Sequence, residues 1–199
     1  MVKKEEVRKY FDSVAVHWDE EMIRDNEIIN NILDDALVCE GKDILDVACG
    51  TGVLIPDYLA RKVNSVTAID FSEEMIKLAQ EKFKQDNVKL LCGDVETEEF
   101  HQKFDCIVVY NAFPHFPEPE KLIACLISYL KVGGTLTVAH GMSRDMLERH
   151  HSGSASKVSI ELMSEEELAR LFEPELTVTA KISDDRMYQV TGVYGSRLF

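Results

Sequence analysis

The chain has 199 residues, of which 45% are hydrophobic, and this suits one domain with a substantial buried core. Its 22 lysines and arginines are outnumbered by 36 aspartates and glutamates, which gives a net charge of −14. Such a charge repels phosphate groups and therefore argues against a nucleic-acid-binding or anionic-membrane-binding surface.

Cysteine usage and the chain start indicate the compartment. The five cysteines form no C-x-x-C pair, which favours a reducing environment. No apolar stretch follows Lys3 and Lys4, so a secretory signal is not expected, and the apolar run 122–130 is too short to span a bilayer. We therefore expect a cytoplasmic protein.

Apolar strands and amphipathic helices alternate through the first 140 residues. Helical spacing of apolar residues predicts helices over 25–38, 53–61, 72–83 and 119–130. Short aliphatic runs predict strands at 43–48, 66–70, 88–92, 104–110 and 135–140. The glycines at 133 and 134 are expected to separate the last helix from the last strand. This alternation is typical of a parallel sheet with helices on both faces.

The remaining residues predict a different arrangement. The polar, serine-containing stretch 143–159 is interpreted as a loop or lid. Ser164 and Glu167 form a capping box for a helix that ends near Phe172. The runs 177–182 and 187–193 flank a turn and predict a terminal antiparallel pair of strands.

A glycine turn follows the first predicted strand, in the segment 46–52 (DVACGTG). A dinucleotide-binding turn needs a small third residue, but the two possible alignments place Ile55 or Val53 there. No Gly-Lys-Ser/Thr follows, which excludes a P-loop. A tight turn without a pyrophosphate cradle favours a nucleoside-type ligand.

Two carboxylates at strand ends support a nucleoside. Asp70 ends the second strand, where a carboxylate can accept hydrogen bonds from both hydroxyls of a ribose. Asp94 follows the third strand and can accept from the exocyclic amine of adenine. Phe71 and Met75 can supply apolar surface for the base. All four positions lie at the carboxyl ends of parallel strands, where open α/β sheets bind ligands.

Five segments, in order, resemble class I S-adenosylmethionine-dependent methyltransferases. The segment 43–52 resembles their first motif, with Ala48 in place of the usual first glycine. The segments 68–75 and 92–95 resemble the ribose-binding and adenine-contacting motifs. The segment 104–116 resembles the fourth-strand motif, and 10–19 resembles the N-terminal cover segment of the small-molecule branch, which includes quinone-biosynthesis methyltransferases.

The resemblance covers nearly the whole chain and implies an α/β, Rossmann-like fold with a mostly parallel seven-stranded sheet in the order 3-2-1-4-5-7-6. It implies one methyltransferase domain over 1–199, with cover helices in 1–40, a cofactor-binding core in 41–140, and a substrate-side lid and antiparallel strand pair in 141–199. The cofactor is expected to be S-adenosylmethionine, and its product S-adenosylhomocysteine. Together with the turn and the carboxylates, the resemblance predicts these cofactor-binding residues: Tyr10, Asp46, Ala48, Cys49, Gly50, Gly52, Asp70, Phe71, Met75, Asp94, Val95 and Asn111.

Four histidines are candidates for a general base or an acceptor contact. His115 and His140 follow the fourth and fifth strands, on the ligand side of the predicted sheet, and His150 and His151 lie in the polar stretch. A base is required only if the acceptor must lose a proton. No metal site is predicted, because adjacent histidines on a regular element point in different directions.

The predicted reaction is methyl transfer to a small molecule through an oxygen, sulfur, nitrogen or carbon atom, in a chain with no nucleic-acid or membrane partner. One alternative is an aminopropyl transferase on the same scaffold, but the segment 111–115 lacks the acidic pair that deprotonates an amine. A second is a non-catalytic module that binds the cofactor without turnover. A third, an NAD-dependent oxidoreductase, is disfavoured by the fingerprint mismatch.

Overall fold

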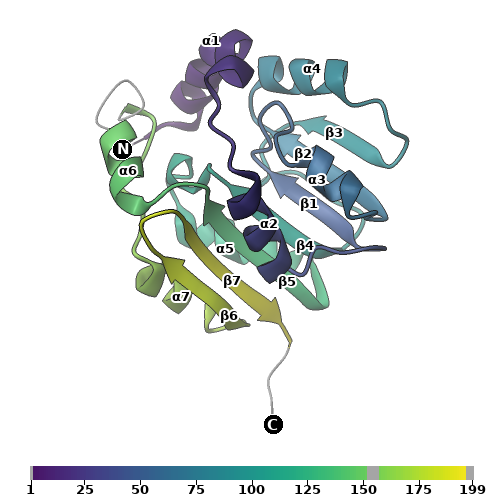
Figure 1. Cartoon of the computed structure of the whole chain (residues 1–199), viewed down its shortest axis with the longest axis vertical. Helices are drawn as coiled ribbons and strands as arrows, with labels where there is room; N and C mark the ends of the chain where they lie inside the picture. Colours follow the sequence, from purple (N-terminus) through teal and green to yellow (C-terminus); the bar gives the residue numbers. More distant parts are fainter. Residues whose placement is uncertain (1, 152–156, 196–199) are drawn as a thin grey trace.

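The structure is a computed structural model that describes residues 2–151 and 157–195 (Figure 1). Its helices are α1 (Lys4–Glu21), α2 (Asn26–Asp35), α3 (Ile55–Ala60), α4 (Glu73–Lys82), α5 (Pro119–Ser128), α6 (Arg144–His151) and α7 (Glu165–Phe172), with a 3₁₀ turn η1 (Phe113–His115). Its strands are β1 (Asp43–Val47), β2 (Ser65–Asp70), β3 (Val88–Cys92), β4 (Phe104–Tyr110), β5 (Leu130–His140), β6 (Leu176–Ser183) and β7 (Tyr188–Tyr194). Within these ranges, no helix combines the length and the apolar character that a membrane-spanning segment needs.

The strands form one sheet in the order β3-β2-β1-β4-β5-β7-β6. Pairing is parallel from β3 through β5 and antiparallel for β7 against both β5 and β6. This confirms the fold class and the strand order that the resemblance implies. The carboxyl ends of β1, β2, β3 and β4 therefore lie along one edge, where a ligand site is expected.

Residues that alternate along the central strands pack into two hydrophobic cores, one on each face of the sheet. On one face, Val47 and Val109 belong to the same buried cluster as residues of α5 and α7. On the other face, Ile44 and Val108 belong to a cluster with residues of α2, α3 and α4. Because both faces are covered, the central strands are mainly apolar, as the sequence predicts.

Local capping signals explain where several helices begin. Ser72 caps α4 by accepting a hydrogen bond from Met75 N, and Asp25 caps α2 by accepting from the amides of Glu27 and Ile28. At α7, Ser164 and Glu167 form the predicted capping box. Each cap satisfies backbone donors that the first helical turn leaves unpaired.

Two predicted elements were wrong. The fifth strand begins at Leu130, before the two glycines, rather than after them. A Cβ on Gly134 would lie 3.0 Å from the Asp105 carbonyl oxygen of β4, and the β4–β5 register shifts at this point. The glycines thus allow a bulge inside the strand instead of ending a helix.

The stretch predicted as a loop or lid contains helix α6. Ser143 begins it, since its side-chain oxygen accepts from Met146 N and its carbonyl accepts from Leu147 N. Leu147 is buried against the core of the α5 face. The polar composition of this stretch predicted irregular structure. The Ser143 cap and the burial of Leu147 explain why it is helical instead.

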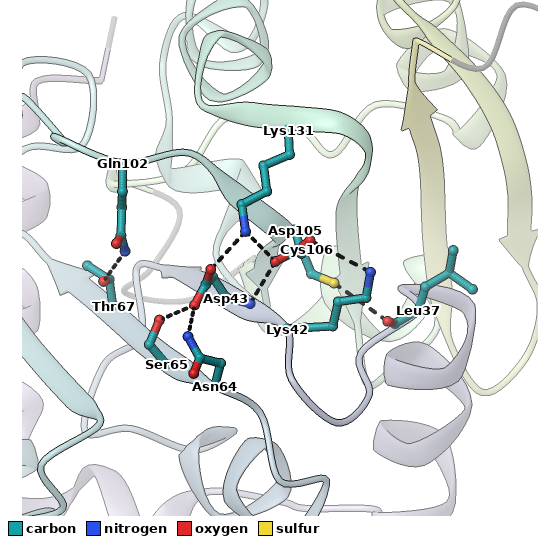
Figure 2. A network of polar contacts seen from close by, with 10 residues as sticks. All are labelled: Leu37, Lys42, Asp43, Asn64, Ser65, Thr67, Gln102, Asp105, Cys106 and Lys131. Atoms are coloured by element: carbon teal, nitrogen blue, oxygen red, sulfur yellow. Dashed lines mark hydrogen bonds and ion pairs between the residues drawn. The ribbon is translucent and has the colours of Figure 1, made fainter.

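The amino ends of β1, β4 and β5 are joined by an ion-pair network on the side of the sheet away from the ligand edge (Figure 2). Lys131 Nζ lies 2.8 Å from Asp43 Oδ2 and 2.7 Å from Asp105 Oδ2. Asp43 also accepts hydrogen bonds from Asn64 and Ser65. Partial burial alone would raise the pKa of Asp43, but these hydrogen bonds outweigh it and lower the pKa to about 2.

We expect Asp43→Asn to lower the free energy of unfolding at pH 7 by about 1 kcal/mol. The folded pKa lies below the ordinary aspartate value of about 3.9, so the ionised form favours folding above about pH 4, and this contribution disappears as the pH falls toward 2. Urea denaturation of both proteins across this range measures the difference. Asp185→Asn, in an exposed turn, is the control; an Asp43→Asn deficit that persists at pH 2 would contradict the prediction.

Candidate active site

A cavity opens at the carboxyl edge of the sheet and is covered by helix α1, which lies beside α4 at that edge (Figure 1). Its walls come from the ends of β1, β2, β3 and β4 and from one side of α1. The lining is mostly apolar, with Asp70, Asp94, Asn111 and His115 among its polar side chains. One cavity thus joins most of the predicted cofactor residues to one of the candidate histidines.

The glycine turn after β1 brings main chain to the cavity. Ala48 and Gly50 both line it, with φ of 54° and 55°. A Cβ on Gly50 would lie 3.6 Å from the indole nitrogen of Trp18, so α1 closes directly over this turn. Gly52 does not line the cavity: its φ is 88°, and a Cβ there would lie 2.6 Å from the ring of Phe83. Gly52 therefore serves helix packing rather than ligand contact.

Cys49, in the same turn, lines the cavity but is almost fully buried. Burial, reinforced by the negative charges of Asp46 and Asp70, raises the pKa of its thiol well above the ordinary value. The thiol therefore stays protonated and is a poor nucleophile.

Asp70 ends β2 and is half-buried in the cavity wall. Its Oδ2 accepts a hydrogen bond from Gly50 N and its Oδ1 accepts from Ser72 N, both at 2.8 Å. Burial raises the pKa of Asp70, while these amide hydrogen bonds work in the opposite direction. Because a carboxylate has about four acceptor positions, Asp70 keeps acceptor capacity for a ligand.

Asp46 lies in β1 behind the turn, is 2% exposed, and does not line the cavity. Its Oδ2 has no hydrogen-bond partner among the described residues. Burial, followed by the nearby charge of Asp70, raises the pKa of Asp46 to about 8. The sequence predicts that Asp46 contacts the cofactor. In the structure, Asp46 lies within β1, before the glycine turn, and its side chain does not line the cavity.

The third strand supplies Asp94 and Val95, both in the cavity wall. Asp94 Oδ1 accepts from Glu96 N at 3.0 Å, and its Oδ2 accepts from Lys4 Nζ at 2.6 Å. Phe71 and Met75 line the same end of the cavity. This end therefore combines a carboxylate with apolar surface.

Helix α1 lies in the expected cover segment, but its lining residues were not among the predicted cofactor contacts. The lining includes Lys4, Val7, Arg8, Phe11 and Trp18 of α1 and Met22 directly after it. Tyr10 does not line the cavity; it lies between the cavity-facing positions, and its ring packs edge-on against Phe11 at 5.3 Å. The missed signal is the recurrence of these residues at intervals of three, four and seven, which marks one side of a helix.

His115 is the candidate histidine that lines the cavity. Its ring packs edge-on against Phe11, with centroids 4.8 Å apart, and its Nδ1 lies 3.0 Å from the carbonyl oxygen of Val158. A carbonyl oxygen can only accept, so Nδ1 carries the proton in this contact. In the neutral ring, the lone pair therefore lies on Nε2.

Of the other candidate histidines, His140 has a described side chain, and it does not line the cavity. His140 is 1% exposed at the end of β5 and packs against the ring of Tyr188, away from the lining. His150 and His151 lie at the end of α6, and their side chains fall outside the described residues. Across the described ranges, no group of three or more histidine, cysteine or acidic side chains is arranged to hold a metal ion.

Asn111 follows β4 and lines the cavity in a left-handed conformation, with φ of 55°. Its side-chain oxygen accepts a hydrogen bond from Gly141 N at 2.9 Å, which ties the end of β4 to the segment after β5. Asn tolerates this backbone region better than most residues. Its side chain thus shapes the cavity wall between the glycine turn and His115.

Comparisons with known proteins agree with this geometry. Residues 44–134 match a family profile described as "Methyltransferase domain". The chain is 30% identical over 169 residues to a malonyl-[acyl-carrier protein] O-methyltransferase of Acetivibrio thermocellus, an alignment that covers 83% of this chain and 59% of that protein. It is 26% identical over 204 residues to a ubiquinone biosynthesis O-methyltransferase of Coxiella burnetii, covering 97% of this chain and 86% of that one.

The fold is shared with solved methyltransferases. The N-methyltransferase NodS of Bradyrhizobium japonicum, solved with S-adenosylhomocysteine, superposes with a TM-score of 0.74 at 14% identity and covers 94% of this chain and 98% of its own. The chain spans just under three fifths of the length of the malonyl-carrier relative but most of the length of the ubiquinone relative. The matched domain, the strand order and these relatives together support a class I S-adenosylmethionine-dependent methyltransferase.

Proposed function

We propose that this chain transfers a methyl group from S-adenosylmethionine to an oxygen atom of a small, largely apolar acceptor. The observation that carries the proposal is the single cavity that runs from Asp70 and Asp94 to His115. The two curated relatives described above are both named O-methyltransferases, which favours oxygen over the other acceptor atoms. The ubiquinone relative matches over most of its length, which favours a small acceptor over a carrier protein.

The cofactor residues divide by chemistry. Asp70 retains acceptor positions for the ribose hydroxyls, and Asp94 can accept from the adenine amine. Phe71 and Met75 supply apolar surface for the base, while the turn at Gly50 and the side chain of Asn111 border the amino-acid part. When bound, S-adenosylmethionine supplies a methyl group already activated by its sulfonium charge.

The cavity that holds His115 is also lined by the aromatic side chains of Phe11, Trp18, Tyr110 and Phe116. Such walls favour a flat, apolar ring and exclude water from the reacting atoms. A hydroxyl on that ring must lose its proton, and His115 Nε2 is the proposed acceptor of that proton. The Val158 carbonyl would hold the opposite ring nitrogen and stabilise the protonated imidazole.

The cofactor assignment is tested by ligand binding. S-adenosylhomocysteine is expected to raise the melting temperature by mass action, whereas NAD is not, because Val53 or Ile55 occupies the third fingerprint position. Calorimetric titration with each ligand measures the two affinities. Tighter binding of NAD would contradict the assignment.

Turnover separates the enzyme from a module that only binds. Incubation with S-adenosylmethionine and a panel of phenols, catechols, thiols and amines, followed by mass spectrometry, is expected to yield S-adenosylhomocysteine and an O-methylated phenolic product. Products methylated only on sulfur or nitrogen would overturn the choice of oxygen. Binding without any product across the panel would favour the non-catalytic alternative.

A further inference from the structure

Lys4 makes contacts that the proposed chemistry does not use. It lies in the first turn of α1, 90 residues away in sequence from Asp94, whose carboxylate it contacts at 2.6 Å. It also forms an ion pair with Glu96, whose side chain is only 1% exposed. One lysine thus pairs with two carboxylates that follow β3.

The burial of the Glu96 side chain makes its ion pair with Lys4 important for the position of α1. A nearly buried carboxylate is costly unless a cation compensates it. Within the described ranges, the other cation within reach of Glu96 is Lys121, at 4.0 Å. Moving Lys4 away would therefore leave the Glu96 carboxylate poorly compensated, and this favours the position of α1 seen here.

The opposite end of α1 is held differently. Residues 22–25 connect α1 to α2, and Arg24 donates to both carboxylate oxygens of Asp57 at 2.6 Å and to the Val53 carbonyl at 2.7 Å. Near that end, Asp19 accepts hydrogen bonds from Thr51 and Lys82. These contacts fix the α2 end of α1 near the glycine turn, whereas Lys4 holds the far end against β3.

From this arrangement we infer that Lys4 is a latch: its ion pairs with Asp94 and Glu96 hold α1 over the adenine end of the cavity and so set the rate of cofactor exchange. The inference rests on the proposed function, because it takes the Asp94 end as the place of the adenine. Lys4 is a positioning residue here. Partial burial opposes its charge, but the hydrogen bonds to Asp94 and Glu96 raise the pKa of Lys4, so the latch stays charged at neutral pH.

The test compares Lys4→Met with Lys9→Met. Lys9 is also on α1, but its side chain is 70% exposed and it pairs only loosely with Glu5, at 3.8 Å. Rapid-mixing measurements of S-adenosylhomocysteine release are expected to show dissociation faster by about tenfold or more in Lys4→Met, since one partner of a desolvated charge pair is lost. Lys9→Met is expected to match the unmodified chain, and Lys4→Arg to restore most of the slow release.

A second readout needs no cofactor. Hydrogen exchange of the free protein is expected to be faster in the first turns of α1 in Lys4→Met but unchanged in α5 and α7, which pack on the opposite face of the sheet. Equal release rates and equal α1 exchange in the two methionine variants would overturn the latch. An unmodified chain that binds no S-adenosylhomocysteine would instead refute the proposed function, while exchange in α1 would still decide whether Lys4 holds the helix.

Discussion

Replacing His115 by Gln is expected to lower kcat for a hydroxyl acceptor by about 10²- to 10⁴-fold, the range typical for loss of a general base. Of the two candidate histidines whose side chains the structure describes, His115 lines the cavity and His140 does not. His115 Nδ1 donates to the Val158 carbonyl, so the lone pair of the neutral ring is on Nε2. Glutamine keeps a similar size but cannot accept the proton.

Two measurements and a control variant separate a base from a structural residue. The affinity for S-adenosylhomocysteine is expected to hardly change in His115→Gln, since the proposed role does not include a cofactor contact. The rate of the unmodified chain is expected to fall as the pH is lowered and histidine takes up a proton, and this fall is expected to disappear in the variant. His17→Gln, with a side chain 69% exposed on α1, is the control. A wild-type rate in His115→Gln would show that alignment alone drives the reaction.

Local sequence patterns, each spanning only a few residues, predicted most of the helices and strands. The capping residues Ser72 and Ser164, the apolar central strands and the terminal antiparallel pair are all confirmed. Each depends on local periodicity or on a cap that satisfies nearby amides. The strand order came from the resemblance, because periodicity does not specify which strands are neighbours.

The errors arose where tertiary contacts decide the outcome. Gly133 and Gly134 looked like a break, but the β4 backbone packs so closely on Gly134 that a bulge forms within a longer strand. The polar stretch around α6 became helical because Leu147 finds a buried site. Neither the facing backbone nor the buried site can be recognised from the local sequence.

The candidate site shows the same division. Motif positions placed Gly50, Asp70 and Asp94 correctly in the cavity wall, because strand ends meet at one edge of the sheet. The same reasoning also predicted Asp46 and His140 at the site, yet both are buried and neither lines the cavity. The ion pairs of Lys4 join α1 to the segment after β3, which is far away in the sequence. No sequence motif predicts this contact.

Asp70→Ala is expected to weaken S-adenosylhomocysteine binding by about 10- to 150-fold, which corresponds to roughly 1.5–3 kcal/mol for hydrogen bonds to a charged group. Two effects contribute: loss of the acceptor for the ribose hydroxyls, and loss of the carboxylate that holds the amides of Gly50 and Ser72. Asp94→Ala is expected to cost less, since its proposed ligand partner is one neutral amine. Calorimetric titration of each variant measures these losses.

An analogue of S-adenosylhomocysteine that lacks both ribose hydroxyls separates the two effects of Asp70. If Asp70 binds the hydroxyls, the analogue binds the unmodified chain more weakly than the natural ligand does, but binds Asp70→Ala about as well as the natural ligand does. If Asp70 only supports the glycine turn, both proteins lose the same factor with the analogue. Equal losses would therefore remove Asp70 from the ribose site and leave it a structural brace between β2 and the turn after β1.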